Sequence, residues 1–152
     1  MKDTIKELRD IVEVFSKKIA NIPDKEFTAK PLPHKWSRIE VLGHLIDSAH
    51  NNLRRFICGQ YESEPPFIVY QQDFWVLSNQ YQQMKKEEII ALWRIMNLRI
   101  CAVLENMPPE HYENKCNTGS LHSLEWLAVD YVKHLKHHMN QIISQSFDVI
   151  YP

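Results

Sequence analysis

The sequence predicts an all-α protein that folds as a four-helix bundle. Four long stretches repeat apolar residues at steps of three and four, the spacing that places them on one face of a helix. Prolines interrupt these stretches at positions 23, 31, 33, 65, 66, 108 and 109, and proline ends or kinks a helix. The chain has 152 residues, about the length of one domain, so we expect a single helical domain over residues 1–152.

The first two helices are expected over residues 3–21 and 37–57. The first carries an amphipathic stripe that ends before a proline. The second begins where Ser37 is followed three residues later by Glu40. This is the pattern of a capping box, in which both residues satisfy free N–H groups at the start of a helix. Gly59 is the expected end of the second helix, since glycine often follows the last helical residue.

The other two helices are expected over residues 86–106 and 123–146, and Ser123 is suited to cap the last one. The linker over residues 58–85 is long and contains the aromatic stretch FIVYQQDFWVL, which resembles a strand. An isolated strand has no partner here, so we interpret the stretch as an ordered loop with a helical turn. A connection of this length allows the helices on either side of it to run parallel.

Charge and composition exclude several classes of protein. The formal net charge is −1, with 18 basic and 19 acidic residues, which indicates no basic surface for nucleic acid. The apolar runs are too short to span a membrane, and the N-terminal residues lack the apolar core of a signal peptide. We therefore expect a cytoplasmic protein with no nucleic-acid or membrane partner. Cys58, Cys101 and Cys116 are widely spaced and form no CxxC motif, so free thiols are expected.

A cluster of histidines occupies the stretch YVKHLKHHMNQII, residues 131–143. Successive residues of an α-helix are rotated by about 100°. His134 and His138 therefore lie on the same edge of the apolar stripe, one turn apart. His137 falls on the far side and should face water. The pair His134 and His138 can bind one metal ion from a single face of the helix.

Two imidazoles need a third ligand, because zinc-type sites usually take three protein ligands and keep one position open when they are catalytic. The second helix offers His44, which shares a polar face with Glu40, Asp47, Asn51 and Arg55. This face is either solvated surface or the wall of a polar cavity between the second and fourth helices. Spacing alone leaves both interpretations open, and the histidines of the fourth helix can equally form a solvated, mildly basic face.

Other catalytic motifs are absent from the sequence. It has no HExxH of the zincin proteases and no paired ExxH of the di-iron bundles. The glycine-rich phosphate-binding, dinucleotide-binding and serine-hydrolase motifs are also missing. Phosphate-binding and serine-hydrolase chemistry therefore lack their usual sequence signals.

Two segments, KWSRIEVLGHLIDSAHNNLRRF and WLAVDYVKHLKHHMNQI, resemble the DinB/YfiT-like superfamily of small metal-binding helical bundles. In that family the first segment follows a W-S entry and carries one ligand histidine, and the second carries two in a signature that includes a glutamine. The resemblance implies that His44, His134 and His138 are the metal ligands. Gln141 matches the signature glutamine, whereas His137 matches no ligand.

The resemblance also implies a fold and a chemistry. It implies a bundle in up-down-down-up order with a divalent metal ion, zinc or nickel, between the second and fourth helices. By their ligand chemistry, three histidines also suit iron or manganese. The resemblance further implies a homodimer. Some relatives act as transferases that use a low-molecular-weight thiol as cosubstrate, and others are described as metal-dependent hydrolases, so a small-molecule substrate is expected. This chain has Met139 and Asn140 where members often have Arg-Gly, so its site surroundings depart from the common pattern.

Such a site supports two kinds of chemistry. A bound ion lowers the pKa of a water ligand toward neutrality, or it holds a thiolate ligand deprotonated. Asp47 lies one turn after His44, and Asp130 lies one turn before His134. Either carboxylate can accept the second ring N–H of a ligand histidine or act as a general base. Either can equally be a surface carboxylate in a salt bridge.

Some residues are further candidates for substrate contact. Aromatic residues in a long loop more often anchor the loop than contact a substrate. One of the two arginines could bind a carboxylate of a thiol cosubstrate. The alternative for each arginine is a surface salt bridge. Two rival functions remain: a non-catalytic protein of stress-response type, in which the metal serves stability or sensing, and a helical dimerisation module without metal. The candidate residues are Arg54, Arg55, Tyr70, Asp73, Trp75 and Tyr81.

Overall fold

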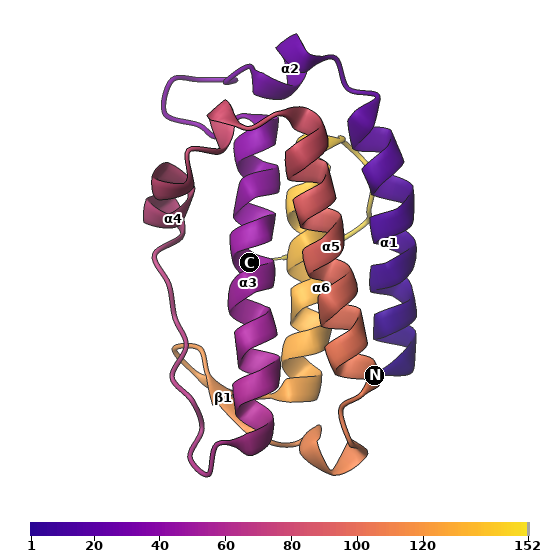
Figure 1. Cartoon of the computed structure of the whole chain (residues 1–152), viewed down its shortest axis with the longest axis vertical. Coiled ribbons are helices and arrows are strands. Elements are labelled where there is room, and N and C mark those ends of the chain that lie inside the picture. The colour runs from indigo at the N-terminus through magenta and orange to yellow at the C-terminus, as the bar shows by residue number, and fades with distance from the viewer. Residues whose placement is uncertain (152) are drawn as a thin grey trace.

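The computed structural model describes residues 1–151, and its four long helices are those that the apolar periodicity predicts (Figure 1). Helix α1 spans Lys2–Ala20, α3 spans Arg38–Tyr61, α5 spans Lys86–Glu105 and α6 spans Leu124–Ile142. The prediction of a mainly helical protein is therefore confirmed. The last helix ends at Ile142, four residues before the expected position 146.

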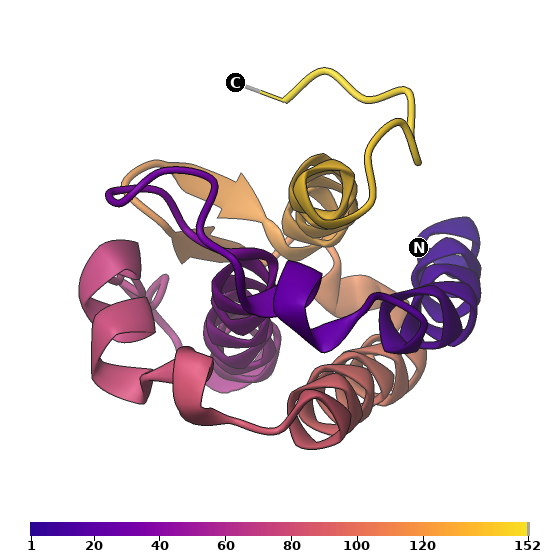
Figure 2. The same ribbon diagram turned by 90° about the horizontal axis from the view of Figure 1, so that it is seen from above.

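The four long helices surround one apolar core (Figure 2). Helix α3 packs against α5 and α6, and α1 packs against the same two helices from the other side. In Figure 1 the segment after α3 returns from the β1 end of the bundle to the α2 end before α5 begins. Large side chains from each long helix fill the interior, among them Leu8, Phe56, Trp93 and Leu135.

Local capping contacts begin α3 and α6, as the sequence predicts. The backbone N–H of Ser37 donates to Glu40 Oε2 at 2.8 Å, and the backbone N–H of Glu40 donates back to Ser37 Oγ at 3.4 Å. Ser123 Oγ accepts the backbone N–H of Trp126 at 3.2 Å. Because these side chains satisfy N–H groups that a helix start leaves free, the entry points of both helices are set by sequence-local contacts.

The expected end of the second helix at Gly59 is wrong, because α3 continues to Tyr61. Gly59 instead allows the close approach of α6. A Cβ atom at this position would lie 2.7 Å from Cδ2 of Leu124. A glycine inside a helix can mark close packing as well as a helix end, and only the neighbouring helix reveals which applies.

Several short elements lie between the long helices, and of these only a helical turn in the linker was predicted. Helices α2 (Asp24–Thr28) and α4 (Gln72–Asn79), the 3₁₀ turns at Tyr81–Gln83 and Pro109–His111, and an antiparallel hairpin of β1 (Lys115–Asn117) and β2 (Leu121–Ser123) connect the long helices. Helix α4 is longer than the single helical turn expected in the linker.

The strand-like part of the linker has a partner, contrary to expectation. The backbone N–H of Ile68 donates to Asn117 O at 2.9 Å, and that of Asn117 donates to Pro66 O at 2.9 Å. Phe67 and Asn117 form a parallel bridge. The partner strand has only three residues and lies about fifty positions away in the chain, which is too short and too distant for periodicity to detect.

The cysteines and the membrane prediction can be compared with the described residues. Cys58, Cys101 and Cys116 are free thiols, and Cys101 and Cys116 are buried, as expected. Over residues 1–151, none of the helices combines the length and apolar character needed to cross a membrane.

Candidate metal centre

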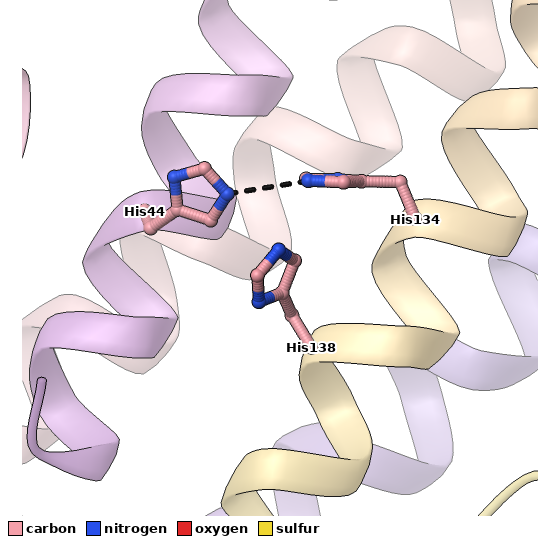
Figure 3. A group of neighbouring side chains, drawn as sticks. All are labelled: His44, His134 and His138. Carbon is pink, nitrogen blue, oxygen red and sulfur yellow. Dashed lines mark hydrogen bonds between the residues drawn. The ribbon is translucent and has the colours of Figure 1, made fainter. Parts of the chain in front are cut away.

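Three histidine side chains converge between α3 and α6 (Figure 3). His44 comes from α3, and His134 and His138 come from successive turns of α6. One ring nitrogen from each lies within 4.8 Å of the other two. The ring of His138 is 4.5 Å from the rings of both His44 and His134, measured between centroids. These are the three residues that the sequence pattern and the family resemblance single out.

The convergence follows from how α3 packs on α6. His134 and His138 are four residues apart and therefore lie on one face of α6. The polar face of α3 turns toward them, because His44 is 0% exposed, Asp47 is 2% exposed and Asn51 is 4% exposed. The interpretation of this face as solvated surface is therefore wrong for these three residues. The face forms part of a polar wall inside the bundle.

Burial keeps the three imidazoles neutral. It lowers the pKa of His44 to about 3, with a smaller contribution from His138. It lowers the pKa of His134 to about 2, aided by the neighbouring histidines, and it also lowers the pKa of His138. All three rings are therefore uncharged at neutral pH. Neutral imidazole is the form that binds a metal ion, so this set of nitrogen donors fits a divalent cation such as zinc.

Two of the three histidines have a polar partner at the second ring nitrogen. Nδ1 of His134 lies 3.4 Å from Ser48 Oγ, and Nδ1 of His138 lies 3.2 Å from Gln141 Oε1. Nδ1 of His44 is buried and has no hydrogen-bond partner among the described residues. Metal-ligating histidines usually donate this second N–H to an oxygen, which orients the ring. Ser48 was not predicted, because serine spacing carries no signal of its own.

Asp47 is held by residues of the linker rather than by a histidine. Its Oδ1 atom accepts the hydroxyl of Tyr81 at 2.6 Å and the side-chain amide of Asn79 at 3.0 Å. Its Oδ2 atom is buried without a partner among residues 1–151. Burial raises the pKa of Asp47 to about 6, although the bond from Tyr81 acts in the opposite direction. The structure thus places Asp47 inside the protein, not in a surface salt bridge.

Asp130 contacts the segment that follows α6. The hydroxyl of Tyr151 donates to Asp130 Oδ2 at 3.2 Å, and the Tyr151 ring lies 5.4 Å from the His134 ring. Neither Asp130 nor Asp47 makes a direct hydrogen bond to a histidine within residues 1–151. Tyr151 belongs to an irregular segment, and such a segment offers no periodicity from which its position could be predicted.

His137 lies outside the cluster of three. Its ring is half-buried, not fully exposed as predicted, because it packs 5.7 Å from the Tyr151 ring. Its Nε2 atom lies 3.4 Å from Nε2 of Gln141. The prediction that His137 does not join the other histidines agrees with this position.

A cleft of about 740 Å³ opens beside the cluster. This volume is in the range of small-molecule sites. His138 and Gln141 form part of its wall, so one histidine of the cluster faces the cleft directly. Trp36 also lines the cleft, and its ring packs 5.0 Å from the His44 ring. The remaining lining includes both polar and apolar side chains, among them Lys30, Pro31, His34, Lys35, Val41 and Asp73.

The linker contributes to this cleft less than expected. Gln72 and Asp73, at the start of α4, line it. The rings of Tyr70 and Trp75 instead pack against each other at 5.6 Å, which fits an anchoring role. Trp36 and His34 also line the cleft, and no functional role was predicted for either from the sequence. His34 lies in a region without periodicity, and Trp36 was recognised only as part of a family motif.

The two arginines differ in their surroundings. Arg55 is half-buried, and its Nη2 and Nε atoms donate to Ile68 O at 2.8 and 3.2 Å. It therefore attaches the linker to α3 and forms no surface salt bridge in the described residues. Arg54 is exposed.

Comparisons with known proteins agree with this fold. The family model of the DinB superfamily matches residues 7–142, so the chain belongs to this superfamily. The structure resembles YfiT from Bacillus subtilis, described as a probable metal-dependent hydrolase with an unusual four-helix bundle topology. The TM-score is 0.82 and the identity is 21%, and the match covers 93% of this chain and 82% of YfiT.

A second similar structure is a mycothiol-dependent maleylpyruvate isomerase. The TM-score is 0.71 and the identity is 12% over 91% of this chain. The match spans 59% of the isomerase, so that enzyme contains a large part without a counterpart here. A search of curated proteins found no match. At these identities the two structures establish the fold alone.

Proposed function

We propose that this protein is a metal-dependent enzyme acting on a small molecule, with His44, His134 and His138 as ligands of one divalent ion. The observation that carries the proposal is the convergence of three neutral imidazoles at the edge of a cleft. One ring nitrogen from each histidine lies within 4.8 Å of the other two, which is close enough for one ion to bind all three. The donor set fits zinc or nickel best, with iron and manganese as alternatives.

Three neutral ligands leave the full charge of the ion in place. A bound divalent cation would supply a water ligand with a lowered pKa or hold a thiolate deprotonated. The chain contributes the surroundings of that position. His138 faces the cleft, and Trp36 packs against the ring of His44, which is fully buried. A substrate in the cleft would therefore meet the site from the His138 side.

The two carboxylates are assigned different roles. Asp130 lies one turn before His134 on α6, and Tyr151 holds one of its oxygens. We assign it as the general base, with the other oxygen as the proton acceptor. Asp47 is farther inside the protein, where both donors to its Oδ1 come from the linker. Its role is to orient a ligand rather than to exchange protons with the substrate.

Hydrolysis is the first candidate reaction, and thiol transfer is the second. YfiT matches this chain over most of both lengths and is described as a probable metal-dependent hydrolase, which supports the first. The mycothiol-dependent isomerase has a similar bundle, which supports a low-molecular-weight thiol as cosubstrate. In a non-catalytic metal protein the ion needs no access, so the cleft beside His138 favours an enzyme.

The proposal extends to the organisation of the protein. It takes residues 1–152 as one bundle domain in up-down-down-up order, supported by the return of the linker along α3. It also takes the protein as a cytoplasmic homodimer. The balanced net charge of −1 supports the absence of a nucleic-acid partner.

The first experiment is elemental mass spectrometry on tag-free protein purified without chelator. Wild type, His134→Ala and His137→Ala are compared, and His137→Ala is the control because it removes a neighbouring imidazole outside the cluster. We expect near-stoichiometric metal in wild type and His137→Ala and its loss in His134→Ala. Absence of metal from wild type, even after reconstitution with zinc, nickel and manganese, would contradict the proposal. Screening of hydrolysable substrates with and without small thiols then separates the two reactions.

A further inference from the structure

Two donors from the linker converge on one oxygen of Asp47. The hydroxyl of Tyr81 lies 2.6 Å from Oδ1, and the amide of Asn79 lies 3.0 Å from the same atom. Tyr81 and Asp47 are both buried. The other oxygen, Oδ2, is buried and has no partner among the described residues. Leaving a buried carboxylate oxygen unpaired is costly, so this oxygen can accept a further hydrogen bond.

A complementary unpaired atom lies one turn earlier on α3. Nδ1 of His44 is buried without a partner, and residues three apart on a helix are neighbours. When Nε2 of a neutral histidine donates its lone pair to a metal ion, the ring proton must be on Nδ1. His134 and His138 already have oxygen atoms near Nδ1, at 3.4 and 3.2 Å. His44 is the member of the set that lacks one.

We propose that Asp47 positions His44 for metal binding by accepting its Nδ1–H on Oδ2, and that Tyr81 and Asn79 hold Oδ1 so that Oδ2 stays available. This inference rests on the proposed function, because it requires an ion at the three histidines. Tyr81 and Asn79 are then positioning residues that act through Asp47 and touch neither metal nor substrate.

The fit of Tyr81 against α3 supports this role. A Cβ atom on Gly43, the residue before His44, would lie 2.0 Å from Cδ2 of the Tyr81 ring. The ring therefore lies directly on the helix backbone beside the ligand. Gln80, with φ of 48°, adopts the left-handed conformation at the turn that leads from α4 into Tyr81. A specific backbone turn and a glycine together bring this hydroxyl to Asp47.

The same contacts connect the cleft to the ligand. Asn79 is the last residue of α4, and Gln72 and Asp73 at the other end of that helix line the cleft. The element that holds Asp47 is thus also a wall of the proposed substrate site. The positioning of His44 depends on a segment that is about thirty residues away in the chain.

A purely structural role for the Tyr81 hydroxyl is the alternative, and the protein contains a matched control. Tyr131 is also buried, and its hydroxyl donates to Asn97 Oδ1 at 2.6 Å, the same distance as between Tyr81 and Asp47. Replacing either tyrosine by phenylalanine removes one short buried hydrogen bond. Only the bond from Tyr81 leads to a carboxylate one turn from His44.

The test is the dissociation constant for zinc, measured by competition with a chromophoric chelator, for wild type, Tyr81→Phe and Tyr131→Phe. The free energy of unfolding of the metal-free proteins is measured in parallel. We expect Tyr81→Phe to weaken zinc binding about tenfold, the lower end of the range for residues that support metal ligands. Tyr131→Phe should lose stability to a similar extent and keep the wild-type affinity. The visible spectrum of the cobalt-substituted protein should change in Tyr81→Phe alone.

Each outcome is decisive. Equal zinc affinities for Tyr81→Phe and Tyr131→Phe would overturn the inference. If wild type still binds zinc in that case, the proposed metal site is unaffected. Wild type that binds no zinc would overturn both. If Tyr81→Phe does not fold, Asn79→Ala tests the same oxygen, since Asn79 is exposed and its loss should not prevent folding. Unchanged affinity in that variant would also overturn the inference.

Discussion

The Nε2 atom of His44 on α3 lies 3.2 Å from the Nε2 atom of His134 on α6, although the two residues are 90 positions apart in the chain. Two neutral imidazoles at this distance can share one proton, so one ring donates and the other accepts. If the two histidines held a metal ion through Nε2, this bond would be lost and each ring would carry its proton on Nδ1. We therefore expect the groups around the two Nδ1 atoms to influence the affinity for a metal ion.

Ser48→Ala is predicted to weaken zinc binding about tenfold, because it removes the oxygen near Nδ1 of His134. The measurement is the same chelator competition. Ser16→Ala is the control: Ser16 Oγ donates to Val12 O within α1, far from the histidines in the sequence. Equal zinc affinity in both serine variants would argue against a role for Ser48.

The metal-free protein is predicted to lose stability as pH falls below 6.5. The folded-state pKa values of His44 and His134 are about 3 and 2, against an ordinary value of 6.5. Above pH 6.5 both rings are neutral in the folded and unfolded states, and this contribution to stability is complete. Between pH 6.5 and about 3, the unfolded histidines bind protons first, which favours unfolding.

Urea unfolding with chelator at pH 7 and pH 4.5 measures this loss. Each buried histidine should contribute about 1–3 kcal/mol to the difference between the two pH values. His134→Gln should therefore show a smaller difference than wild type, and His50→Gln, an exposed position, should not. An unchanged pH dependence in His134→Gln would contradict the prediction.

Asp47→Asn is predicted to gain stability relative to the wild type as pH rises. Burial raises the pKa of Asp47 from 3.8 to about 6, so the folded state favours the protonated carboxyl. The contribution of Asp47 to the stability of the wild type is therefore complete below pH 3.8 and is lost as pH rises through 6. Asparagine does not ionise. The difference in free energy of unfolding between variant and wild type should increase by about 1–3 kcal/mol from pH 4 to pH 7.5.

The same denaturant series, run without metal, checks this expectation, with Asp148→Asn as an exposed control. Asp47→Asn should also weaken zinc binding, because it replaces a charged acceptor with an amide. A residue that lowers stability at neutral pH and strengthens metal binding is expected where function constrains the sequence. A parallel pH course for the two variants would show that Asp47 ionises normally.

Gly43→Ala is predicted to destabilise the protein by about 1–3 kcal/mol or more, the usual cost of overpacking a core. The added methyl would meet the Tyr81 ring at 2.0 Å. Gly59→Ala is the matched control, because its methyl would meet the movable end of Leu124 at 2.7 Å, and it should cost less. Thermal and urea unfolding measure both changes.

A double-mutant cycle tests the cause. In a Tyr81→Leu background the aromatic ring is gone, so Gly43→Ala should cost less than in wild type, since mutations at touching residues are not additive. Additive costs would show that the glycine is needed for some other reason. Zinc affinity of Gly43→Ala should fall together with the displacement of Tyr81.

The helices were predictable because their signals are local. Apolar periodicity and the caps at Ser37 and Ser123 involve residues within one turn of each other. The short elements were missed for the opposite reason. The pairing of Phe67 with Asn117 joins two segments that are each too short to show a pattern.

The candidate site was predictable in part. The angle between positions 134 and 138 on a helix places both imidazoles on one edge, and the family resemblance adds His44. The angle between positions on α6 does not predict which element packs against that edge. The polar face of α3 therefore had two open interpretations until its burial was known. The partners of Asp47 and Asp130 come from irregular segments that periodicity does not describe.

The sequence by itself determined four amphipathic helices, the caps at Ser37 and Ser123, and the placement of His134 and His138 on one edge of a helix. Those features depend on residues only a few positions apart, and their spacing can be seen directly in the sequence. Only the tertiary structure decided that His44 meets His134, that Tyr81 reaches Asp47, and that a cleft opens at His138. These relationships depend on how separate helices and loops pack, and close packing is a property of the whole folded chain.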